Sequence, residues 1–165
     1  MLRIRPALPS DAAPLTELYN HYVRETAITF DIEPWTVAQR ERWMSDFAET
    51  GRYRLRIAEE DGRVAGYACT RRFRDKAAYE TTVEVSAYLL PDVPRRGIGT
   101  ALYTALFDSI RAEDVHRAIA GITLPNAAST ALHQRFGFTL VGVMTDVGRK
   151  FERYWDVAWY EKALG

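Results

Sequence analysis

The sequence is short of cysteine, of net charge and of long apolar runs, and each shortage excludes a class of protein. Cys69 is the only cysteine, so no disulfide can form within the chain and a reducing compartment is expected. The 22 Lys and Arg residues balance 22 Asp and Glu residues, whereas a protein that mainly binds nucleic acid normally has a basic excess. No apolar run could span a membrane and the start of the chain lacks a signal-peptide pattern, so we expect a cytoplasmic protein.

Histidine is scarce as well. His21, His116 and His133 are scattered, and no pair of His or Cys residues has the spacing of metal ligands, so we expect no metal site. Cys69 is interpreted as a small core residue of a strand. The 165 residues, of which 47% are hydrophobic and 27% charged, fit one soluble domain over residues 1–165 with a sizeable core.

The hydrophobic pattern predicts strands and helices in mixed order. Leu2 and Ile4 alternate with arginines as a first strand, and Asp11 is expected to cap a helix that runs to about Glu25. Thr36 and Gln39 have the spacing of a capping box, which predicts a second helix near 37–48. Further strands are expected at 53–59, 64–72, 82–90 and 118–123, helices after position 99 and over 127–135, and a closing hairpin of 139–146 with 151–160. This order indicates a mixed α/β or α+β fold with helices on both faces of a sheet.

The most informative segment is Pro94-Arg95-Arg96-Gly97-Ile98-Gly99-Thr100, which follows an apolar strand and opens an amphipathic helix. Glycine lets the backbone approach an anion, and the N-terminus of a helix offers unpaired N–H groups and a partial positive charge. The two arginines add permanent charge. The segment is neither a P-loop nor a three-glycine dinucleotide fingerprint. We expect it to hold the pyrophosphate of a cofactor, and the alternative is a strand-to-helix turn with solvated arginines.

A second segment, Leu124 to Phe138, places Asn126 between a strand and a helix that stops at Gly137. Taken singly, Asn126 would be a helix cap and His133 a surface histidine. In this order after the basic loop, however, the chain resembles the GNAT superfamily of acetyl-CoA-dependent N-acetyltransferases. That family's cofactor motif, Q/R-x-x-G-x-G/A, is followed by an Asn and a helix ending in Gly-Phe. The first position of the motif, usually Gln or Arg, is Pro94 here.

The resemblance covers the whole length and narrows to the phosphinothricin acetyltransferase group. The segments that carry it are Asn20-His21-Tyr22, Thr29 to Thr36, Thr82-Val83-Glu84, Leu124-Pro125-Asn126, Leu132-His133, Val147 to Lys150 and Trp155-Asp156-Val157. It implies a splayed, mostly antiparallel seven-stranded sheet flanked by helices, acetyl-CoA as the acetyl donor, and a homodimer. The cofactor contacts that it implies are Ala87, Tyr88, Leu89, Arg95, Arg96, Gly97, Ile98, Gly99, Thr100, Asn126 and Arg135.

Two residues are candidates for catalysis. The resemblance places the family's general base at Glu84, and an amine must lose a proton before it can attack a thioester. On a central strand, burial would raise the pKa of Glu84 towards the working pH; the alternative is a strand glutamate paired with Arg72 or Arg74. His133 occupies the position of the tyrosine that protonates the leaving thiolate in many relatives, and a structural role fits it equally well.

The acceptor side is expected in two segments. The resemblance places Phe30 and Glu33 in the acceptor pocket, while Arg74, Lys76 and Tyr79 would hold an acidic group of the substrate unless they form a solvated loop. The implied reaction is direct transfer of acetyl, in a ternary complex, to the amine of a compound like phosphinothricin, methionine sulfone or methionine sulfoximine. The alternatives are a protein N-terminal acetyltransferase of the same fold and a non-catalytic acyl-CoA-binding module.

Overall fold

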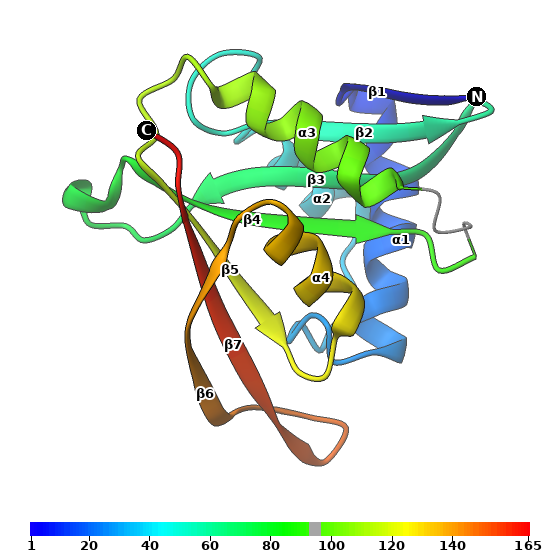
Figure 1. Cartoon of the computed structure of the whole chain (residues 1–165). Helices are drawn as coiled ribbons and strands as arrows, with labels where there is room; N and C mark the ends of the chain where they lie inside the picture. The colour runs from blue at the N-terminus through cyan, green and yellow to red at the C-terminus, as the bar shows by residue number, and fades with distance from the viewer. Residues whose placement is uncertain (93–96) are drawn as a thin grey trace.

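A computed structural model describes residues 1–92 and 97–165, in which a seven-stranded sheet carries helices on both faces (Figure 1). In chain order the elements are β1 (Leu2–Pro6), η1 (Pro9–Asp11), α1 (Ala12–Glu25), α2 (Val37–Met44), β2 (Leu55–Glu60), β3 (Arg63–Arg72), η2 (Ala77–Tyr79), β4 (Thr82–Leu89), α3 (Ile98–Ile110), β5 (Arg117–Thr123), α4 (Ala127–Arg135), β6 (Thr139–Lys150) and β7 (Arg153–Ala163). Within the described residues, no helix is both long and apolar enough to cross a membrane.

The strand order is β1-β2-β3-β4-β5-β7-β6, and β4 and β5 form the single parallel pair among these neighbours. That pair is short, because only residues Thr82 to Glu84 of β4 pair with Arg117 to Ile119 of β5. Beyond Glu84 the two strands diverge, as Figure 1 shows. The expected sheet, mostly antiparallel and splayed, is therefore confirmed.

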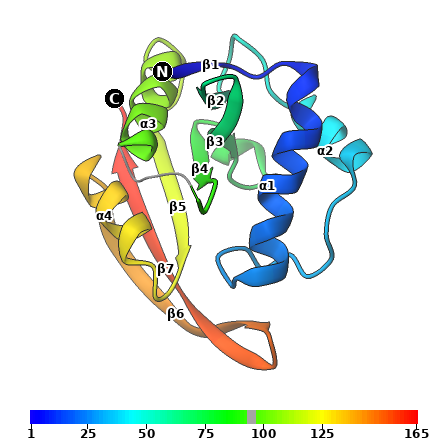
Figure 2. The same ribbon diagram turned by 90° about the vertical axis from the view of Figure 1, so that its right-hand side faces the viewer.

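The sheet separates two hydrophobic cores, each covered by helices (Figure 2). Leu102 and Leu106 of α3 are fully buried on one face, where α4 also lies. Leu15 and Leu18 of α1 fill the other face together with Cys69, which is fully buried as expected for a small core residue. Burial of such side chains is the main favourable term in folding, so the two cores fix where the helices sit on the sheet.

The two faces of β4 belong to different cores. Side chains alternate across a strand, and Val83 and Val85 join the core under α3. Glu84 and Tyr88 therefore point to the opposite face, where the Tyr88 ring packs edge-on against Tyr19 of α1 with ring centroids 5.3 Å apart. This alternation places the candidate base on the α1 face of the sheet.

The helix ends show where local sequence signals were sufficient. The capping box before α2 is confirmed, since the Gln39 backbone N–H donates to Thr36 Oγ1 at 3.2 Å and the Thr36 N–H to Gln39 Oε1 at 2.8 Å. The helix ends at Met44 rather than near residue 48, because the Ser45 hydroxyl donates to the Arg42 carbonyl and competes with the helical pattern.

Asp11 occupies the N-cap position of α1, which ends at Glu25 as expected, but its side chain makes no capping hydrogen bond to the helix. Its carboxylate accepts the Leu8 N–H at 2.7 Å and two hydrogen bonds from Arg5 of β1, and none from the first turn of α1. The nearby guanidinium and the turn of η1 satisfy the carboxylate, so Asp11 fastens β1 to the start of the helix instead.

The closing hairpin is longer than expected. Its two-residue turn is Phe151 and Glu152, both with φ above +50°, and β6 runs on to Lys150. Two residues with positive φ form the turn type that suits a tight hairpin, but glycine and asparagine usually signal it and neither is present. The pairing also shifts between Met144 and Gly148 around Asp146 (φ 52°), which hides the alternation of the strand.

Candidate active site

A cleft of about 460 Å³ opens where β4 and β5 diverge. Its walls are the end of β4, the start of α3, the end of β5 and one side of α4. The sequence-predicted residues that line it are Ala87, Tyr88, Leu89, Gly97, Ile98, Gly99, Thr100, Asn126, His133 and Arg135. Arg95 and Arg96, which were predicted beside them, lie outside the described residues.

The end of β4 turns towards this cleft backbone groups that no described strand pairs, and of these the Leu89 carbonyl accepts the Tyr22 hydroxyl at 2.5 Å. Leu90 N–H donates to the Ala65 carbonyl at 2.9 Å, and hydrogen-bonded pairs alternate along antiparallel strands, so the backbone of Tyr88 pairs with β3. The N–H and C=O groups of Ala87 and Leu89 face the other way, towards the opened gap. No strand of the described chain pairs with them there. An extended ligand with amide groups therefore has an edge to bind.

The N-terminus of α3 closes one end of the cleft. Gly97 precedes the helix with φ 80°, a conformation that glycine adopts without strain, and no described side chain caps the helix. The uncapped N–H groups of the first turn, with the partial charge of the helix, favour an anion. Arg135 of α4 reaches this end, where its Nη1 donates to Thr100 Oγ1 at 3.4 Å.

Gly99 and Asn126 fix the two helices that flank the cleft. A Cβ atom at position 99 would lie 3.3 Å from Leu132 Cδ2 and 3.9 Å from Leu89 Cδ1, so a larger residue would push α3 away from α4. The side-chain oxygen of Asn126 accepts the Ser129 N–H at 3.1 Å, so that Asn126 caps α4. The cap occupies only the oxygen, which leaves the amide N–H groups for a ligand.

His133 is buried between α4 and α3, with 4% of its surface exposed. Its Nδ1 lies 2.8 Å from the Ser129 carbonyl oxygen and its Nε2 lies 2.8 Å from the Tyr103 hydroxyl. Because a carbonyl can only accept, Nδ1 carries the proton and Nε2 accepts from Tyr103. Burial lowers the pKa of His133, and the bond to Ser129 opposes part of that change. The imidazole is therefore neutral at neutral pH with both nitrogens occupied.

This bond between α3 and α4 leads to a first prediction. Tyr103→Phe leaves Nε2 of His133 buried without a donor, and we expect the free energy of unfolding to fall by about 1–3 kcal/mol. Urea denaturation measures it. Tyr154→Phe, at a side chain 57% exposed, is the control and should change stability little. Equal midpoints for the two variants would mean that the bond contributes nothing to stability.

Glu84 stands half-buried at the point where β4 and β5 separate. Burial raises the pKa of the Glu84 carboxyl above its ordinary value, and the positive charge of Arg71, which pairs with it in register on β3, opposes part of that rise. A carboxylate with a raised pKa beside a cleft is typical of a general base.

The arginines expected as alternative partners of Glu84 lie elsewhere. Arg72 bonds to Tyr53, and the Arg74 guanidinium stacks over Phe73 and Tyr79 at 5.1 and 5.8 Å from the ring centroids. The arginine that faces Glu84 is Arg71. The two residues are directly opposite each other on β3 and β4, and residues paired in this way point to the same face of the sheet.

The residues predicted to bind the acceptor fall into two groups, and none of them lines the 460 Å³ cleft. Arg74 and Tyr79 come together in the loop between β3 and β4, where Lys76 precedes η2 and is exposed. Phe30 lies in the loop between α1 and α2, and its ring covers Gly148 of β6, where a Cβ atom would be only 2.1 Å away. Glu33, in the same loop, is exposed.

The loop between α1 and α2 is held by a network of hydrogen bonds that sequence reasoning missed. The Tyr19 hydroxyl donates to Asp31 Oδ2 at 2.6 Å, and Trp35 Nε1 donates to the same oxygen at 2.9 Å. Lys150 of β6 is buried, and its Nζ donates to the Thr29 carbonyl at 2.8 Å. Burial lowers the pKa of Lys150, and the charge of Asp31 opposes part of the change. An acid within an aromatic segment was the signal available in the sequence.

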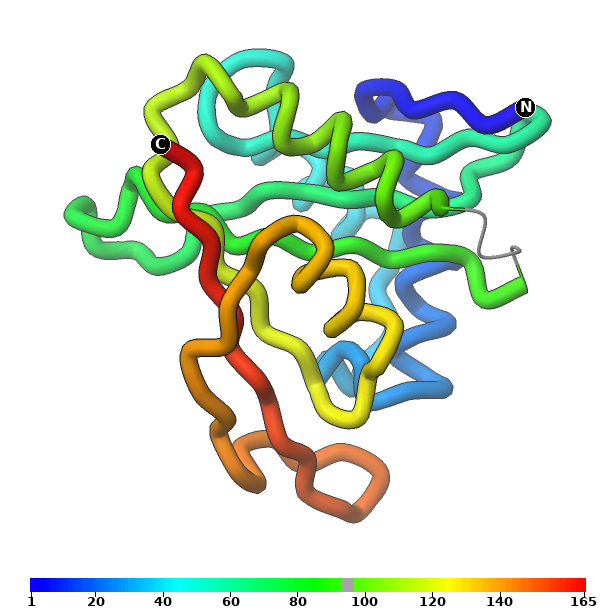
Figure 3. The backbone as a smooth tube through the Cα atoms, in the orientation of Figure 1, coloured from blue at the N-terminus to red at the C-terminus, as the bar shows by residue number. Residues whose placement is uncertain are grey.

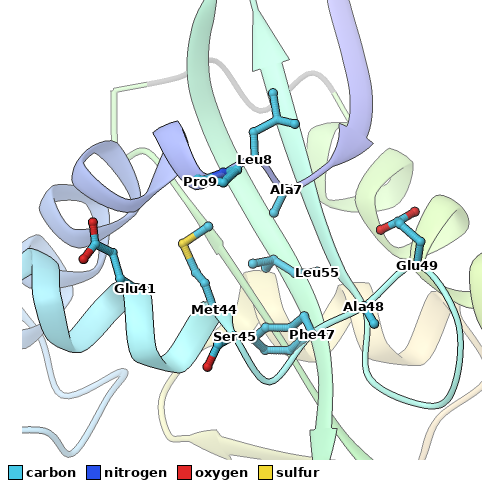
Figure 4. A pocket seen from close by; sticks show the side chains of 10 residues that line it. All are labelled: Ala7, Leu8, Pro9, Glu41, Met44, Ser45, Phe47, Ala48, Glu49 and Leu55. Carbon is cyan, nitrogen blue, oxygen red and sulfur yellow. The ribbon is translucent and has the colours of Figure 1, made fainter.

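A second pocket, of about 470 Å³, lies between the end of β1, α2 and β2 (Figure 4). Apolar side chains such as Leu8, Met44 and Phe47 form most of its surface. Glu41 and Glu49 stand at its two sides in Figure 4, and Glu49 is paired with Arg56 at 2.9 Å. It contains neither the strand edge nor the helix N-terminus that meet at the first cleft.

Comparison with known proteins agrees with this geometry. Residues 4–159 match the acetyltransferase (GNAT) domain family. The chain is 54% identical to the phosphinothricin N-acetyltransferase of Streptomyces coelicolor, over 99% of this chain and 96% of that one. It is 34% identical to the L-methionine sulfoximine/L-methionine sulfone acetyltransferase of Pseudomonas aeruginosa, over 98% and 94% of the two chains. A phosphinothricin acetyltransferase from Sinorhizobium meliloti, solved with acetyl-CoA, superposes with a TM-score of 0.92 at 32% identity, covering 99% of this chain and 89% of that one. The chain therefore belongs to the GNAT family of acetyltransferases.

Proposed function

We propose that this enzyme transfers the acetyl group of acetyl-CoA to the amine of a small amino-acid-like compound, of the phosphinothricin or methionine sulfone and sulfoximine type. The observation that carries the proposal is the cleft at the divergence of β4 and β5, which joins a strand edge without a strand partner in the described chain to an uncapped helix N-terminus, with Glu84 at the last β4–β5 pair, next along β4 to the lining residue Val85. The names of the relatives, which include phosphinothricin and methionine sulfoximine acetyltransferases, support the substrate class.

The donor fits the cleft in two parts. The backbone edge at Ala87 and Leu89 suits the amides of the pantetheine arm, as it would suit a peptide strand. The first turn of α3 suits the pyrophosphate, with Arg135 beside it and the predicted Arg95 and Arg96 adding charge.

On the acceptor side, Glu84 takes the proton from the substrate ammonium group. The neutral amine then attacks the thioester carbon and the C–S bond breaks, and the proton that the nitrogen loses as the amide forms goes to the departing CoA thiolate, which leaves as the thiol. The raised pKa of Glu84 matches this task, because a base is most effective when its pKa lies near the operating pH.

His133 has two roles open to it, protonation of the thiolate or the positioning of α4. We propose the second. Its neutral ring donates through Nδ1 to Ser129 and accepts through Nε2 from Tyr103, so no proton is directed at the cleft. A CoA thiolate can leave without a dedicated acid.

Glu84→Gln keeps the shape of the side chain and removes the proton acceptor. We expect kcat to fall roughly 10²–10⁴-fold, with acetyl-CoA affinity unchanged. In the unaltered enzyme, kcat/KM should rise with pH through the raised pKa of Glu84, since only the ionised carboxylate accepts a proton. The variant should lose that rise and recover partly at high pH, where free amine is present. The exposed Glu80→Gln is the control, and wild-type turnover of Glu84→Gln near neutral pH would make Glu84 structural.

Gly99→Val tests the donor site. The added methyl groups would clash with Leu132 and push the start of α3 away from α4. Because the first turn of α3 is the proposed pyrophosphate site, calorimetric titration should show acetyl-CoA binding weakened roughly ten- to hundred-fold. Gly165→Val is the control, because no atom lies within 4 Å of a Cβ there and the residue lies outside the proposed dimer surface. Unchanged affinity in a folded Gly99→Val protein would remove this segment from the donor site.

The predicted role of Arg74 and Lys76 can be tested with acceptors that carry or lack an acidic group. Stacking on Phe73 and Tyr79 leaves the edge of the Arg74 guanidinium open to an anion. Methionine sulfone should be acetylated roughly ten- to hundred-fold better than a matched amine without the carboxylate, since one charge-assisted contact contributes about 1.5–3 kcal/mol. Arg74→Ala or Lys76→Ala should reduce that preference, whereas Arg111→Ala, at an exposed site, should not. Equal kcat/KM values for the two acceptors would exclude the amino-acid class.

We also propose a cytoplasmic homodimer, the location resting on the single buried cysteine. The edge strand β6 exposes an apolar row, and the β6–β7 hairpin extends beyond the rest of the chain (Figure 3). The row is Leu140, Val141, Val143, Met144 and Val147. Pairing with a second copy would cover an edge that otherwise invites aggregation. Light scattering should give twice the mass of one chain, and Val143→Lys should shift the protein towards the monomer; a monomeric wild-type protein would contradict the proposal.

A further inference from the structure

Arg40 of α2 is a charged side chain in an apolar interior. It is 1% exposed and is the largest of the fully buried side chains. Its Nε and Nη2 have no hydrogen-bond partner, and no ion pair within residues 1–92 and 97–165 includes it. Burial of a charge without a counter-ion is strongly unfavourable, so something else in the fold must stabilise it.

Aromatic rings surround the Arg40 guanidinium. Its Cζ atom lies 4.4 Å from the ring centroid of Trp35, 4.5 Å from that of Trp43 and 4.6 Å from that of Tyr19. A fourth ring, Tyr67, is 5.9 Å away. Guanidinium groups bind ring faces at these distances, most strongly when water is excluded. The cage therefore replaces the missing counter-ion, and the cation in turn fixes the rings.

Two of these rings carry the effect to Asp31. Tyr19 and Trp35 present their faces to Arg40 and their polar edges to the Asp31 carboxylate, at 2.6 and 2.9 Å. A cation on the face of a ring draws electron density towards itself, which makes the O–H or N–H at the edge a better donor. Arg40 and Asp31 are thus linked through the rings between them.

Asp31 belongs to the loop that lies beside the candidate site. Thr29 of this loop bonds to Lys150 of β6, and Ile28 lines the donor cleft. Tyr19 also packs against Tyr88, which shares the α1 face of β4 with Glu84. The loop, through its Thr29, and Tyr19 of α1 therefore both contact Tyr88, which lies four residues along β4 from Glu84 on the same face.

We propose that Arg40 is a positioning residue for the acceptor amine: through Tyr19, Trp35 and Asp31 it holds the loop of residues 29–35 against β4 and β6. This inference rests on the proposed function, because it assumes that the enzyme binds an acceptor amine in front of this loop. It differs from that function in its residues, since neither Arg40 nor Asp31 touches the donor cleft.

The experiment compares Arg40→Met with Arg42→Met, which makes the same change on the exposed side of the same helix. For Arg40→Met we expect the KM for methionine sulfone to rise about tenfold, with the acetyl-CoA KM within about twofold of wild type. Arg42→Met should change neither. Arg40→Lys restores the charge without the planar group and should recover part of the loss.

Near-UV circular dichroism of the free protein is the second measurement, because Trp35 and Trp43 contact the guanidinium directly. Its tryptophan bands should change in Arg40→Met and not in Arg42→Met. If wild type acetylates no acceptor, the proposed function fails, and the bands still decide whether the cage orders the rings. An unchanged acceptor KM with unchanged bands would overturn the inference, as would an equal rise in both KM values. If Arg40→Met does not fold, Asp31→Asn cuts the same network at its half-buried end and must raise the acceptor KM alone.

Discussion

The candidate site depends on one limit to hydrogen bonding: β4 and β5 pair through three residues and then part. Each strand is fully paired on its other side, β4 with β3 and β5 with β7, so neither can turn back to close the gap. The gap leaves the backbone of Ala87 and Leu89 without a strand partner; the Tyr22 hydroxyl donates to the Leu89 carbonyl, and the other groups need a hydrogen-bond partner from solvent or a ligand. Helices α3 and α4 then hold the sides of the gap apart, joined by the bond of Tyr103 to His133. A site for an extended, amide-bearing ligand thus follows from the way in which the sheet is divided.

The proposed donor and acceptor sides lie on different faces of the sheet. The proposed donor cleft lies beside the core under α3 and α4, whereas the loop of residues 29–35 is held by Tyr19 of α1 and Trp43 of α2. Glu84 lies where they meet, since β4 contributes one face to each. Separate support means that the acceptor loop can vary while the donor site keeps its geometry. Arg40, Asp31 and Lys150 are the charged groups of that loop's anchorage, and each is satisfied by rings or by backbone rather than by a surface ion pair.

Much of the fold could be predicted because its signals are local. The capping box at Thr36 depends on residues three apart, and the apolar run of β4 was sufficient to place Glu84 on a central strand. What failed depends on tertiary contacts. Asp11 was expected to cap a helix, but Arg5 lies on the neighbouring strand and takes its carboxylate. Arg71 faces Glu84 only through the register of β3 with β4. The burial of Arg40 could not be inferred either, because its four rings come from three elements and a loop.

Burial acts on the titratable groups around the site in one direction, towards their neutral forms. It raises the pKa of Glu84 and lowers the pKa values of His133 and Lys150. The same environment would disfavour the ammonium form of a bound acceptor, since desolvation penalises any charged group. An ammonium ion beside an ionised Glu84 would gain attraction, yet transfer of one proton removes both charges at once. The proposed proton transfer to Glu84 is therefore favoured by the protein interior itself, before the thioester takes any part. The permanent charges of Arg74 and Lys76 are kept on an exposed loop, where they can meet an acidic group without opposing that transfer.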